Sequence, residues 1–405
     1  MYQFDYPERI RRVQKKLKVE KAACALIMKP ANLRYLTGFW GYATRPEYFE
    51  PRRLIVLVVP QNGEPVLVVP KIEFDFAKAA TRGLQLEIRR HVEWSEKGEA
   101  EDAWGVARDF VMKAGITSGT LTVEKQHLTV RAFAALESSF PQFTIQEGSG
   151  WVDRMRMIKE PVEIELMRHC GELASSMYEV QAEALARGGY REYEVAMLGL
   201  QHVVEKCAEA LAHTDVNSPI GEGLQLITSG PRLSRAHGSA SCRMIGSDDV
   251  VQFDYCRVPY LLGYRAAMGR VVSLRALRSE EREIEATVNQ AYQLGVSLLR
   301  PGAVSGDVDS AIRQVLISAG LGQYIMHRSG RGVGIEMIEL PEIKEGITDR
   351  IEEGMIISIE PGIYRDGFCS RIENMLLVTK DAPQVLTPAP TAIKVLKGHK
   401  NPGHA

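Results

Sequence analysis

The sequence lacks the features that mark several large classes of protein. No apolar run approaches the roughly 20 residues that a membrane-spanning helix needs, and the first residues contain no apolar core like that of a secretory signal. The net charge is −1, so the composition does not indicate binding to nucleic acid or to a membrane surface. No low-complexity tract or short-period repeat is present. We therefore expect a cytoplasmic globular protein that binds neither nucleic acid nor membrane.

Cysteine is sparse, and no two cysteines form a CxxC pair. The six cysteines are scattered along the chain, which favours reduced thiols in a cytoplasmic protein over a framework of disulfides. None is an obvious nucleophile. Cys256 lies two residues after Asp254, but a buried and chemically inert thiol is the commoner role of such a residue.

The first part of the chain alternates helix and strand patterns. A length of 405 residues with 45% apolar and 25% charged residues is sufficient for two globular domains. Residues 7–22 predict an amphipathic helix, and Asn62-Gly63 predicts a hairpin turn. Short β-rich runs occupy residues 23–29, 52–60, 65–70 and 116–126. These patterns predict an α/β N-terminal domain with a mixed sheet, over residues 1–152.

A second pattern follows. Pro161 suits the first turn of a helix, and Met167, Leu173 and Met177 then recur at helical spacing. Further helices are expected over residues 191–211, 279–299 and 306–319, the last ending at Gly320. Strand-like runs cover residues 224–230, 248–255, 264–274, 355–364 and 373–380. Helices interspersed with antiparallel-looking strands predict an α+β catalytic domain over residues 153–405.

Several sequence blocks carry a family resemblance. The acidic landmarks are Asp254 in VVQFDYC, Glu360 in SIEPGIY and Glu373 in RIENML. NLRYLTGF, RMRMIK, LITSGPR with an Ala-His-Gly, and HRSGRGVG precede or separate them. In this order the blocks resemble the pita-bread superfamily of prolidases, proline aminopeptidases, methionine aminopeptidases and creatinases. The resemblance covers nearly the whole chain and implies a creatinase-like α/β N-terminal domain followed by an α+β pita-bread catalytic domain.

The chain departs from that family at two metal ligands. Metallopeptidases of the superfamily bind two metal ions with two Asp, one His and two Glu. Aligning Gly263-Tyr264 with the family's GY places Ala267 where the second Asp belongs, and Arg331 stands where the His belongs. A two-metal site needs a bridging carboxylate, and a guanidinium beside Glu360 and Glu373 would offset their repulsion without any ion. We therefore expect no catalytic metal and no cofactor.

Creatinase and ectoine hydrolase are metal-independent members that the chain resembles at these positions. Both hydrolyse a C–N bond in a small charged substrate. In creatinase the general acid–base is a His on the segment that matches LITSGPRLSRAH, so the resemblance assigns this role to His237. The main prediction is a metal-independent, creatinase-like hydrolase that cleaves an amide, amidine, ureido or cyclic C–N bond in a small polar metabolite.

The predicted catalytic residues are His237, Asp254, Glu360 and Glu373. Asp254 would be a nucleophile, a water-positioning base or a cation clamp, or else only an ion-pair partner of Arg331. Glu360 and Glu373 would bind a cationic group of the substrate or hold the lytic water, or else form a structural charge network with Arg331, Arg270 and Arg371.

Four residues are predicted to bind substrate: Arg331, His327, Tyr264 and Arg53. Arg331 would stabilise a developing oxyanion, grip a substrate carboxylate, or balance charge only. His327 would orient substrate or bond the glycine-rich loop around it. Tyr264 begins a run similar to one in ectoine hydrolase.

The resemblance to creatinase also implies a homodimer. In creatinase an Arg from the N-terminal domain of the neighbouring subunit holds the substrate carboxylate. The candidates here are Arg45, Arg52 and Arg53, of which we favour Arg53 because it directly precedes a predicted strand. A loop of the N-terminal domain would then reach the neighbouring active site.

Two rival functions remain open, and a third, C–S lyase chemistry on a sulfonium substrate, is disfavoured because the lyases of this fold depend on a metal. The first is an Xaa-Pro aminopeptidase or dipeptidase with an atypical metal site built from Asp254, Glu360 and Glu373, which predicts bound Mn, Zn or Co and loss of activity in chelator. The second is a non-catalytic pseudoenzyme that binds a peptide or protein. The presence of His237 weighs against the second.

Overall fold

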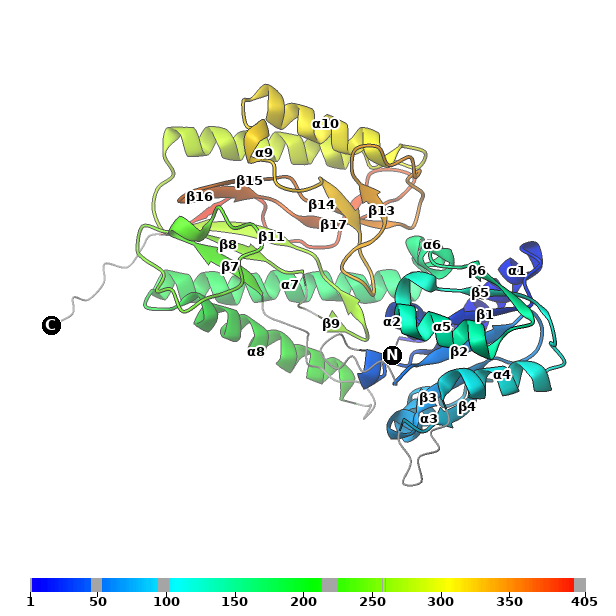
Figure 1. The fold of residues 1–405 in the computed structure, drawn as a ribbon. Coiled ribbons are helices and arrows are strands. Elements are labelled where there is room, and N and C mark those ends of the chain that lie inside the picture. The colour runs from blue at the N-terminus through cyan, green and yellow to red at the C-terminus, as the bar shows by residue number, and fades with distance from the viewer. Residues whose placement is uncertain are drawn as a thin grey trace. The chain divides into compact units, whose positions relative to one another are not determined.

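The computed structural model describes residues 2–44, 53–93, 102–212, 225–256, 258 and 260–396. It divides into two compact units, Gln3–Arg156 and Met157–Ala405 (Figure 1). The two-domain architecture is thereby confirmed, whereas the limits 1–152 and 153–405 stay a prediction. Within the described ranges, no helix is both long enough and apolar enough to cross a membrane.

The N-terminal unit is built on one six-stranded sheet. Its strands are β1 Cys24–Ile27, β2 Val56–Pro60, β3 Val66–Pro70, β4 Glu87–His91, β5 Gly119–Val123 and β6 Phe143–Glu147. They are ordered β4-β3-β2-β1-β5-β6. Strand β1 pairs antiparallel with β2 and parallel with β5, so the sheet is mixed as predicted. Asn62-Gly63 connects the antiparallel pair β2 and β3, also as predicted.

Six α-helices accompany this sheet among the described residues: α1 Tyr6–Val19, α2 Pro30–Thr37, α3 Phe74–Ala80, α4 Ala103–Lys113, α5 Val130–Ser139 and α6 Trp151–Met157. Helix α1 begins where the Asp5 carboxylate accepts a hydrogen bond from the Glu8 amide at 2.9 Å. Helices α4 and α5 pack Trp104, Val111 and Leu136 against β-strand residues in one buried cluster.

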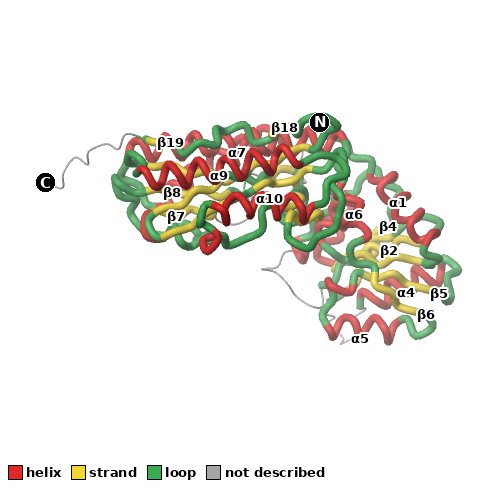
Figure 2. The backbone as a smooth tube through the Cα atoms, turned by 90° about the horizontal axis from the view of Figure 1, so that it is seen from above, coloured by secondary structure: helices red, strands yellow, loops and turns green. Residues whose placement is uncertain are grey.

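The C-terminal unit has two helix pairs with strands between them. Helices α7 Pro161–Arg187 and α8 Glu192–Leu211 lie on one side of the strands, and α9 Ser279–Leu298 and α10 Ser305–Ser318 lie on the other (Figure 1). Seen from above, the axes of α7, α9 and α10 are roughly aligned (Figure 2). Pro161 opens α7, where the Glu163 side chain accepts from the Glu160 amide at 2.8 Å. These helices agree with the predicted ranges to within a few residues.

Among its described residues, the strands of this unit form two larger sheets and two short hairpins. The first sheet is β19-β11-β8-β7, the second is β13-β12-β14-β17-β18, and the hairpins are β9/β10 and β15/β16. The strands are β7 Leu226–Ser229, β8 Val250–Asp254, β9 Tyr260–Leu261, β10 Tyr264–Arg265, β11 Gly269–Ser273, β12 Gly330–Gly332, β13 Glu339–Ile343, β14 Ile356–Ile359, β15 Gly362–Arg365, β16 Phe368–Arg371, β17 Asn374–Leu377, β18 Gln384–Val385 and β19 Lys394–Val395.

Two predicted strands are interrupted. The run 264–274 breaks between β10 and β11, and the run 355–364 breaks at Glu360-Pro361 between β14 and β15. Proline has no amide proton to donate to a ladder, so Pro361 ends strand pairing there. The second break places Glu360 at the end of β14, next to the hairpin.

Within the part of the chain that the structure describes, one antiparallel bridge, between Gly269 and Glu373, joins the two sheets. The Gly269 amide donates to the Glu373 carbonyl at 3.2 Å, and the Glu373 amide donates back at 3.1 Å. Gly269 is also the partner of Asp254 in the β8/β11 ladder. Directly opposed residues in a sheet project to the same face, so Asp254 and Glu373 project together on either side of a glycine.

Candidate active site

The three predicted carboxylates converge in the C-terminal unit. Asp254 is the last residue of β8, Glu360 directly follows β14, and Glu373 directly precedes β17. All three are buried. The Gly269 bridge brings Asp254 beside Glu373, and the β14/β17 pairing brings Glu360 to the same place, since Ile359 lies opposite Asn374.

Two buried arginines contact these carboxylates. Arg331, in the middle of β12, places Nη1 2.9 Å from Glu373 Oε1 and 3.4 Å from Glu360 Oε1. Arg371, the last residue of β16, places Nη2 2.8 Å from Glu373 Oε2, 3.0 Å from Glu360 Oε2 and 3.1 Å from Asp254 Oδ2. Each guanidinium therefore bridges acidic groups, and Arg331 lies where the sequence led us to expect it.

Arg371 is the residue whose importance the sequence did not reveal. It had been considered only as one member of a charge network, together with Arg270. Arg270 instead donates to the Glu373 carbonyl at 2.8 Å and to Asn374 Oδ1 and the Ala389 carbonyl, each at 2.6 Å. The available signal was the spacing Arg371-x-Glu373, because alternate residues of an extended chain share a face.

The cluster holds more negative than positive charge. Three carboxylates face two guanidiniums, which leaves one negative charge unbalanced when all acids are ionised. Burial raises the pKa of Glu360 to about 7 and also raises the pKa of Asp254. Although burial opposes it, contact with Arg331 and Arg371 holds the pKa of Glu373 below its usual range. One proton held among these carboxylates would balance the charge of the cluster.

His327 supports Arg371 rather than the carboxylates. Its Nδ1 lies 2.8 Å from the Arg328 carbonyl oxygen, which only accepts, so Nδ1 carries the proton. Its Nε2 then accepts from the Tyr364 hydroxyl at 2.8 Å, and this hydroxyl accepts from Arg371 Nη1 at 2.6 Å. Arg371 Nη1 also lies 2.9 Å from Nε2. Burial and the charge of Arg371 lower the pKa of His327 to about 3, so it is neutral at physiological pH. Its substrate-binding role stays a prediction.

Gly269 makes room for Arg371. A Cβ added at this glycine would lie 2.7 Å from Arg371 Nε and 3.1 Å from Glu373 Cβ. Any other residue at this position would push the guanidinium away from the carboxylates.

His237 is exposed, and it lies close enough to His327 for the two imidazoles to interact electrostatically. The segment that carries it is held by the buried carboxylate of Glu192, which accepts from the Ser241 amide at 3.0 Å and the Ser229 hydroxyl at 2.7 Å. Glu192 also binds Arg232 in an ion pair. The segment is thus anchored on both sides of His237, whose catalytic role stays a prediction.

The other predicted substrate-binding residues have contacts elsewhere. The Tyr264 hydroxyl donates to Glu163 Oε1 of α7 at 2.6 Å. Arg53 belongs to the N-terminal unit, where its Nε lies 3.1 Å from Glu93 Oε1. Arg45 and Arg52 lie outside the described residues. The roles of Tyr264 and Arg53 stay predictions.

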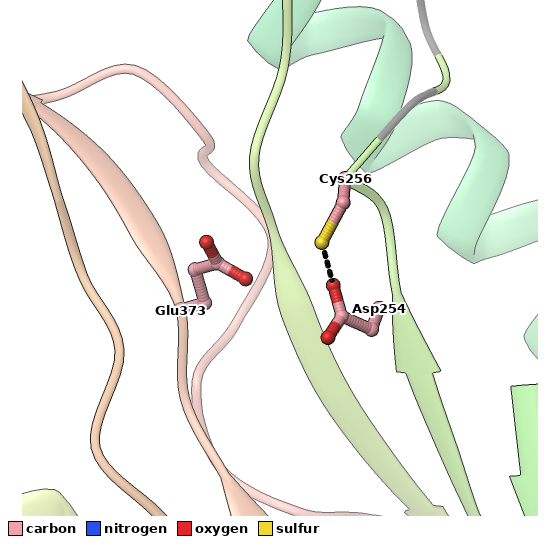
Figure 3. A group of neighbouring side chains, drawn as sticks. All are labelled: Asp254, Cys256 and Glu373. Carbon is pink, nitrogen blue, oxygen red and sulfur yellow. Dashed lines mark hydrogen bonds between the residues drawn. The ribbon is translucent and has the colours of Figure 1, made fainter. Parts of the chain in front are cut away.

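One group of side chains fits a metal ion. Asp254, Cys256 and Glu373 each offer a ligand atom, and these atoms lie within 4.8 Å of one another. Figure 3 shows the three side chains together, with the Cys256 thiol donating to Asp254 Oδ1. Among the described residues, none donates a hydrogen bond to the buried Asp254 Oδ2, which has only its ion pair with Arg371. Carboxylate and thiolate ligands are a set that zinc accepts.

The same residues do not fit two ions. Ala267 is buried and offers no ligand where a bridging carboxylate is expected. The guanidinium of Arg331 fills the space beside Glu360 and Glu373.

Two family models match the chain. The model of metallopeptidase family M24 matches residues 165–380, more than half of the 405 residues. The chain belongs to metallopeptidase family M24. The Creatinase/Prolidase N-terminal domain matches residues 9–158. The predicted superfamily and its fold class, an α/β domain followed by a pita-bread domain, are confirmed.

Named relatives of this M24 protein are peptidases. An Xaa-Pro dipeptidase of Lactobacillus delbrueckii subsp. lactis is 28% identical over 374 residues, which cover 92% of this chain and 94% of that protein. An Xaa-Pro dipeptidase of Lactobacillus helveticus is 26% identical over 378 residues, with 92% and 94% covered. The structure of an Xaa-Pro dipeptidase from Bacillus anthracis has a TM-score of 0.81 at 23% identity, with 97% and 100% covered, and shows the fold alone.

These findings correct the main functional prediction. A metal-independent, creatinase-like hydrolase of a small polar metabolite is wrong, because the named relatives are dipeptidases and the site contains a possible metal-binding group. The broader prediction of a hydrolase is confirmed by the family. The error arose because the sequence reasoning counted the ligands lost at Ala267 and Arg331 but set Cys256 aside.

Proposed function

We propose that the protein hydrolyses the peptide bond of short Xaa-Pro substrates and that it uses an atypical metal site. The observation that carries the proposal is the group Asp254, Cys256 and Glu373, whose ligand atoms lie within 4.8 Å of one another in a chain of family M24. The dipeptidase names of its relatives support the substrate class. These three residues would hold the ion, which when bound supplies Lewis-acid chemistry for amide hydrolysis.

Residues of the chain would handle the protons of the reaction. Peptide hydrolysis needs a group that takes a proton from water and a group that returns one to the leaving nitrogen. Glu360 has a pKa of about 7 and can exchange a proton at its carboxylate near neutral pH. In this proposal, the exposed imidazole of His237 would protonate the proline nitrogen as it leaves.

The arginines would set the geometry of the acids. Arg331 and Arg371 hold both oxygens of Glu360 and Glu373, so neither carboxylate can rotate freely. His327 in turn fixes Arg371. Fixed acidic groups reduce the reorganisation that a reaction requires.

The test is an activity assay on purified full-length protein with Ala-Pro and, as a control, Ala-Ala. We expect hydrolysis of Ala-Pro in preference to Ala-Ala, loss of activity after treatment with chelator, and recovery when a divalent ion is added. Asp254→Asn and Glu373→Gln should each abolish turnover. Absence of hydrolysis of any Xaa-Pro dipeptide with Zn²⁺, Co²⁺ or Mn²⁺ supplied would refute the proposal.

A second candidate is a binding protein that recognises such peptides without turnover. The observation that favours it is that Arg331 and Arg371 already compensate Glu360 and Glu373 without an ion. Calorimetry with Ala-Pro separates the two, since binding heat without product formation supports only this second function. The homodimer and the cytoplasmic location remain proposals, the first of which light scattering would test.

A further inference from the structure

We infer that the site takes a single divalent ion per chain and that Cys256 binds this ion as a thiolate, which selects ions of the zinc and cobalt kind over manganese and magnesium. The inference rests on the proposed function and specifies the ion that it uses. Four observations carry it: the direction of the Cys256 side chain, its neighbours, the charge of the cluster and the position of Arg331.

The strand geometry directs Cys256 to the carboxylates. The ladder of β8 continues past Asp254, since the Tyr255 amide donates to the Met268 carbonyl at 2.9 Å. Alternate residues of an extended chain project to the same face. Tyr255 accordingly projects the other way, with its hydroxyl bonded to Gln181 of α7, while Cys256 projects beside Asp254.

The Cys256 thiol already points at the carboxylate with which it would share an ion. It is buried, and its proton is donated to Asp254 Oδ1. Because it donates to Asp254 Oδ1, the Cys256 sulfur carries its proton in this arrangement. A divalent ion that binds sulfur displaces this proton to the solvent, which balances the binding step.

The charge of the cluster matches one ion. With all three carboxylates ionised, two guanidiniums leave one negative charge, and a Cys256 thiolate would raise this to two. Binding of the ion would therefore release the protons held by the carboxylates as well as the thiol proton. One divalent ion neutralises the site completely. A second ion would leave two positive charges buried, which is costly in a low-dielectric interior.

Arg331 also excludes a second ion by its position. Two-metal sites hold their ions about 3.5–4 Å apart through shared carboxylates. Here the guanidinium of Arg331 is buried and contacts Glu373 Oε1 at 2.9 Å, and Ala267 contributes no ligand. Arg331 thus fills the position of one ion. The remaining ion would replace Arg371 as the partner of Asp254 Oδ2, which is now 3.1 Å from Arg371 Nη2.

The chemistry of sulfur determines which ion is preferred. Thiolates bind borderline and soft ions such as Zn²⁺ and Co²⁺, whereas Mn²⁺ and Mg²⁺ prefer sites made of oxygen ligands. A site of two carboxylates and one thiolate should therefore prefer Zn²⁺ and Co²⁺ over Mn²⁺ and Mg²⁺ more strongly than a site made of carboxylates and imidazole alone.

The test is a titration of the full-length, chelator-treated protein with Co²⁺, followed by the charge-transfer absorption of a cobalt–thiolate bond. We expect this band to saturate at one Co²⁺ per chain in the wild type and in Cys242→Ser, a control at an exposed cysteine. The band should be absent in both Cys256→Ser and Cys256→Ala. Circular dichroism checks that each variant folds, and if one of them does not, the other still provides the test.

A competition experiment measures the preference. Removing residues that only support metal ligands costs on the order of 10-fold in affinity. Cys256→Ser should therefore lower Zn²⁺ affinity by at least about that factor while it changes Mn²⁺ affinity less. Two bound ions per chain, an unchanged band in both Cys256 variants, equal losses for Zn²⁺ and Mn²⁺, or no binding of any ion would each overturn the inference.

The outcomes separate this inference from the proposed function. If the cobalt–thiolate band depends on Cys256 but the protein hydrolyses no Xaa-Pro dipeptide, the inference about the ion is supported and the proposed function is refuted. Ala-Pro hydrolysis that depends on an ion bound without Cys256 would do the reverse.

Discussion

Replacing Arg331 by Met, which retains most of the aliphatic stem, should destabilise the ion-free protein by about 3 kcal/mol at pH 8. Arg331 is 2% exposed and lies 2.9 Å from Glu373 and 3.4 Å from Glu360. Removing one partner of a buried ion pair typically costs about 3–5 kcal/mol because the other charge stays buried. Arg371 still contacts both carboxylates, which puts the expected cost at the lower end.

The pH dependence of this cost identifies its origin. Glu360 has a pKa of about 7, so it is protonated at pH 5 and no longer needs a cationic partner. The cost of Arg331→Met at pH 5 should therefore be smaller than at pH 8 by at least about 1 kcal/mol. Urea unfolding of the full chain at both pH values, followed by circular dichroism, measures the difference in free energy of unfolding.

The matched control for this experiment is Arg365→Met. Arg365 pairs with Glu280 at the surface, where an ion pair contributes about 0–1 kcal/mol. If Arg331→Met costs no more than the control, and equally at both pH values, the charge balance described for the cluster is incorrect.

Two further predictions concern the same cluster. Folding raises the pKa of Glu360 from 4.5 to about 7, so its contribution to stability is complete below about pH 4.5 and is lost as the pH rises through 7. Relative to Glu360→Gln, the ion-free wild type should lose up to about 3 kcal/mol in free energy of unfolding over this interval, measured by urea titration. Parallel pH profiles of the two proteins would contradict this assignment. Gly269→Ala should lower the free energy of unfolding by about 1–3 kcal/mol and impair Ala-Pro hydrolysis, because the added Cβ would lie 2.7 Å from Arg371 Nε. The control is Gly105→Ala in α4, whose added Cβ would have no neighbour nearer than 3.7 Å and should leave activity unchanged. Equal effects of the two substitutions would argue against close packing at Gly269.

Local patterns in the sequence predicted the elements whose formation depends on neighbours in the chain. The helices expected over 279–299 and 306–319 correspond to α9 and α10, and Gly320 adopts the left-handed conformation, with φ of 75°, that ends the second. The strand break at Glu360-Pro361 was also readable in principle from the proline.

The sequence did not reveal which residues meet across the fold. Arg371 contacts three carboxylates from separate strands, and only the pairing of both sheets brings these together. Cys256 likewise becomes a candidate ligand only because Glu373, which directly precedes a strand of the other sheet, lies near it in the fold. A comparison of ligand positions with a family pattern registers losses at Ala267 and Arg331, but it does not show a ligand gained at a new position.

The bridge between Gly269 and Glu373 links the candidate metal-binding group to the separation of the two sheets. Asp254 ends β8 of one sheet, with Cys256 two residues further on, and Glu373 directly precedes β17 of the other sheet. A fluctuation that separates the two sheets therefore also separates these three side chains. The amide protons of Gly269 and Glu373, which hold the two sheets together, would exchange with solvent through that opening. An ion shared by the two sheets would bind only the closed form, so it would slow exchange at these amides in proportion to its occupancy.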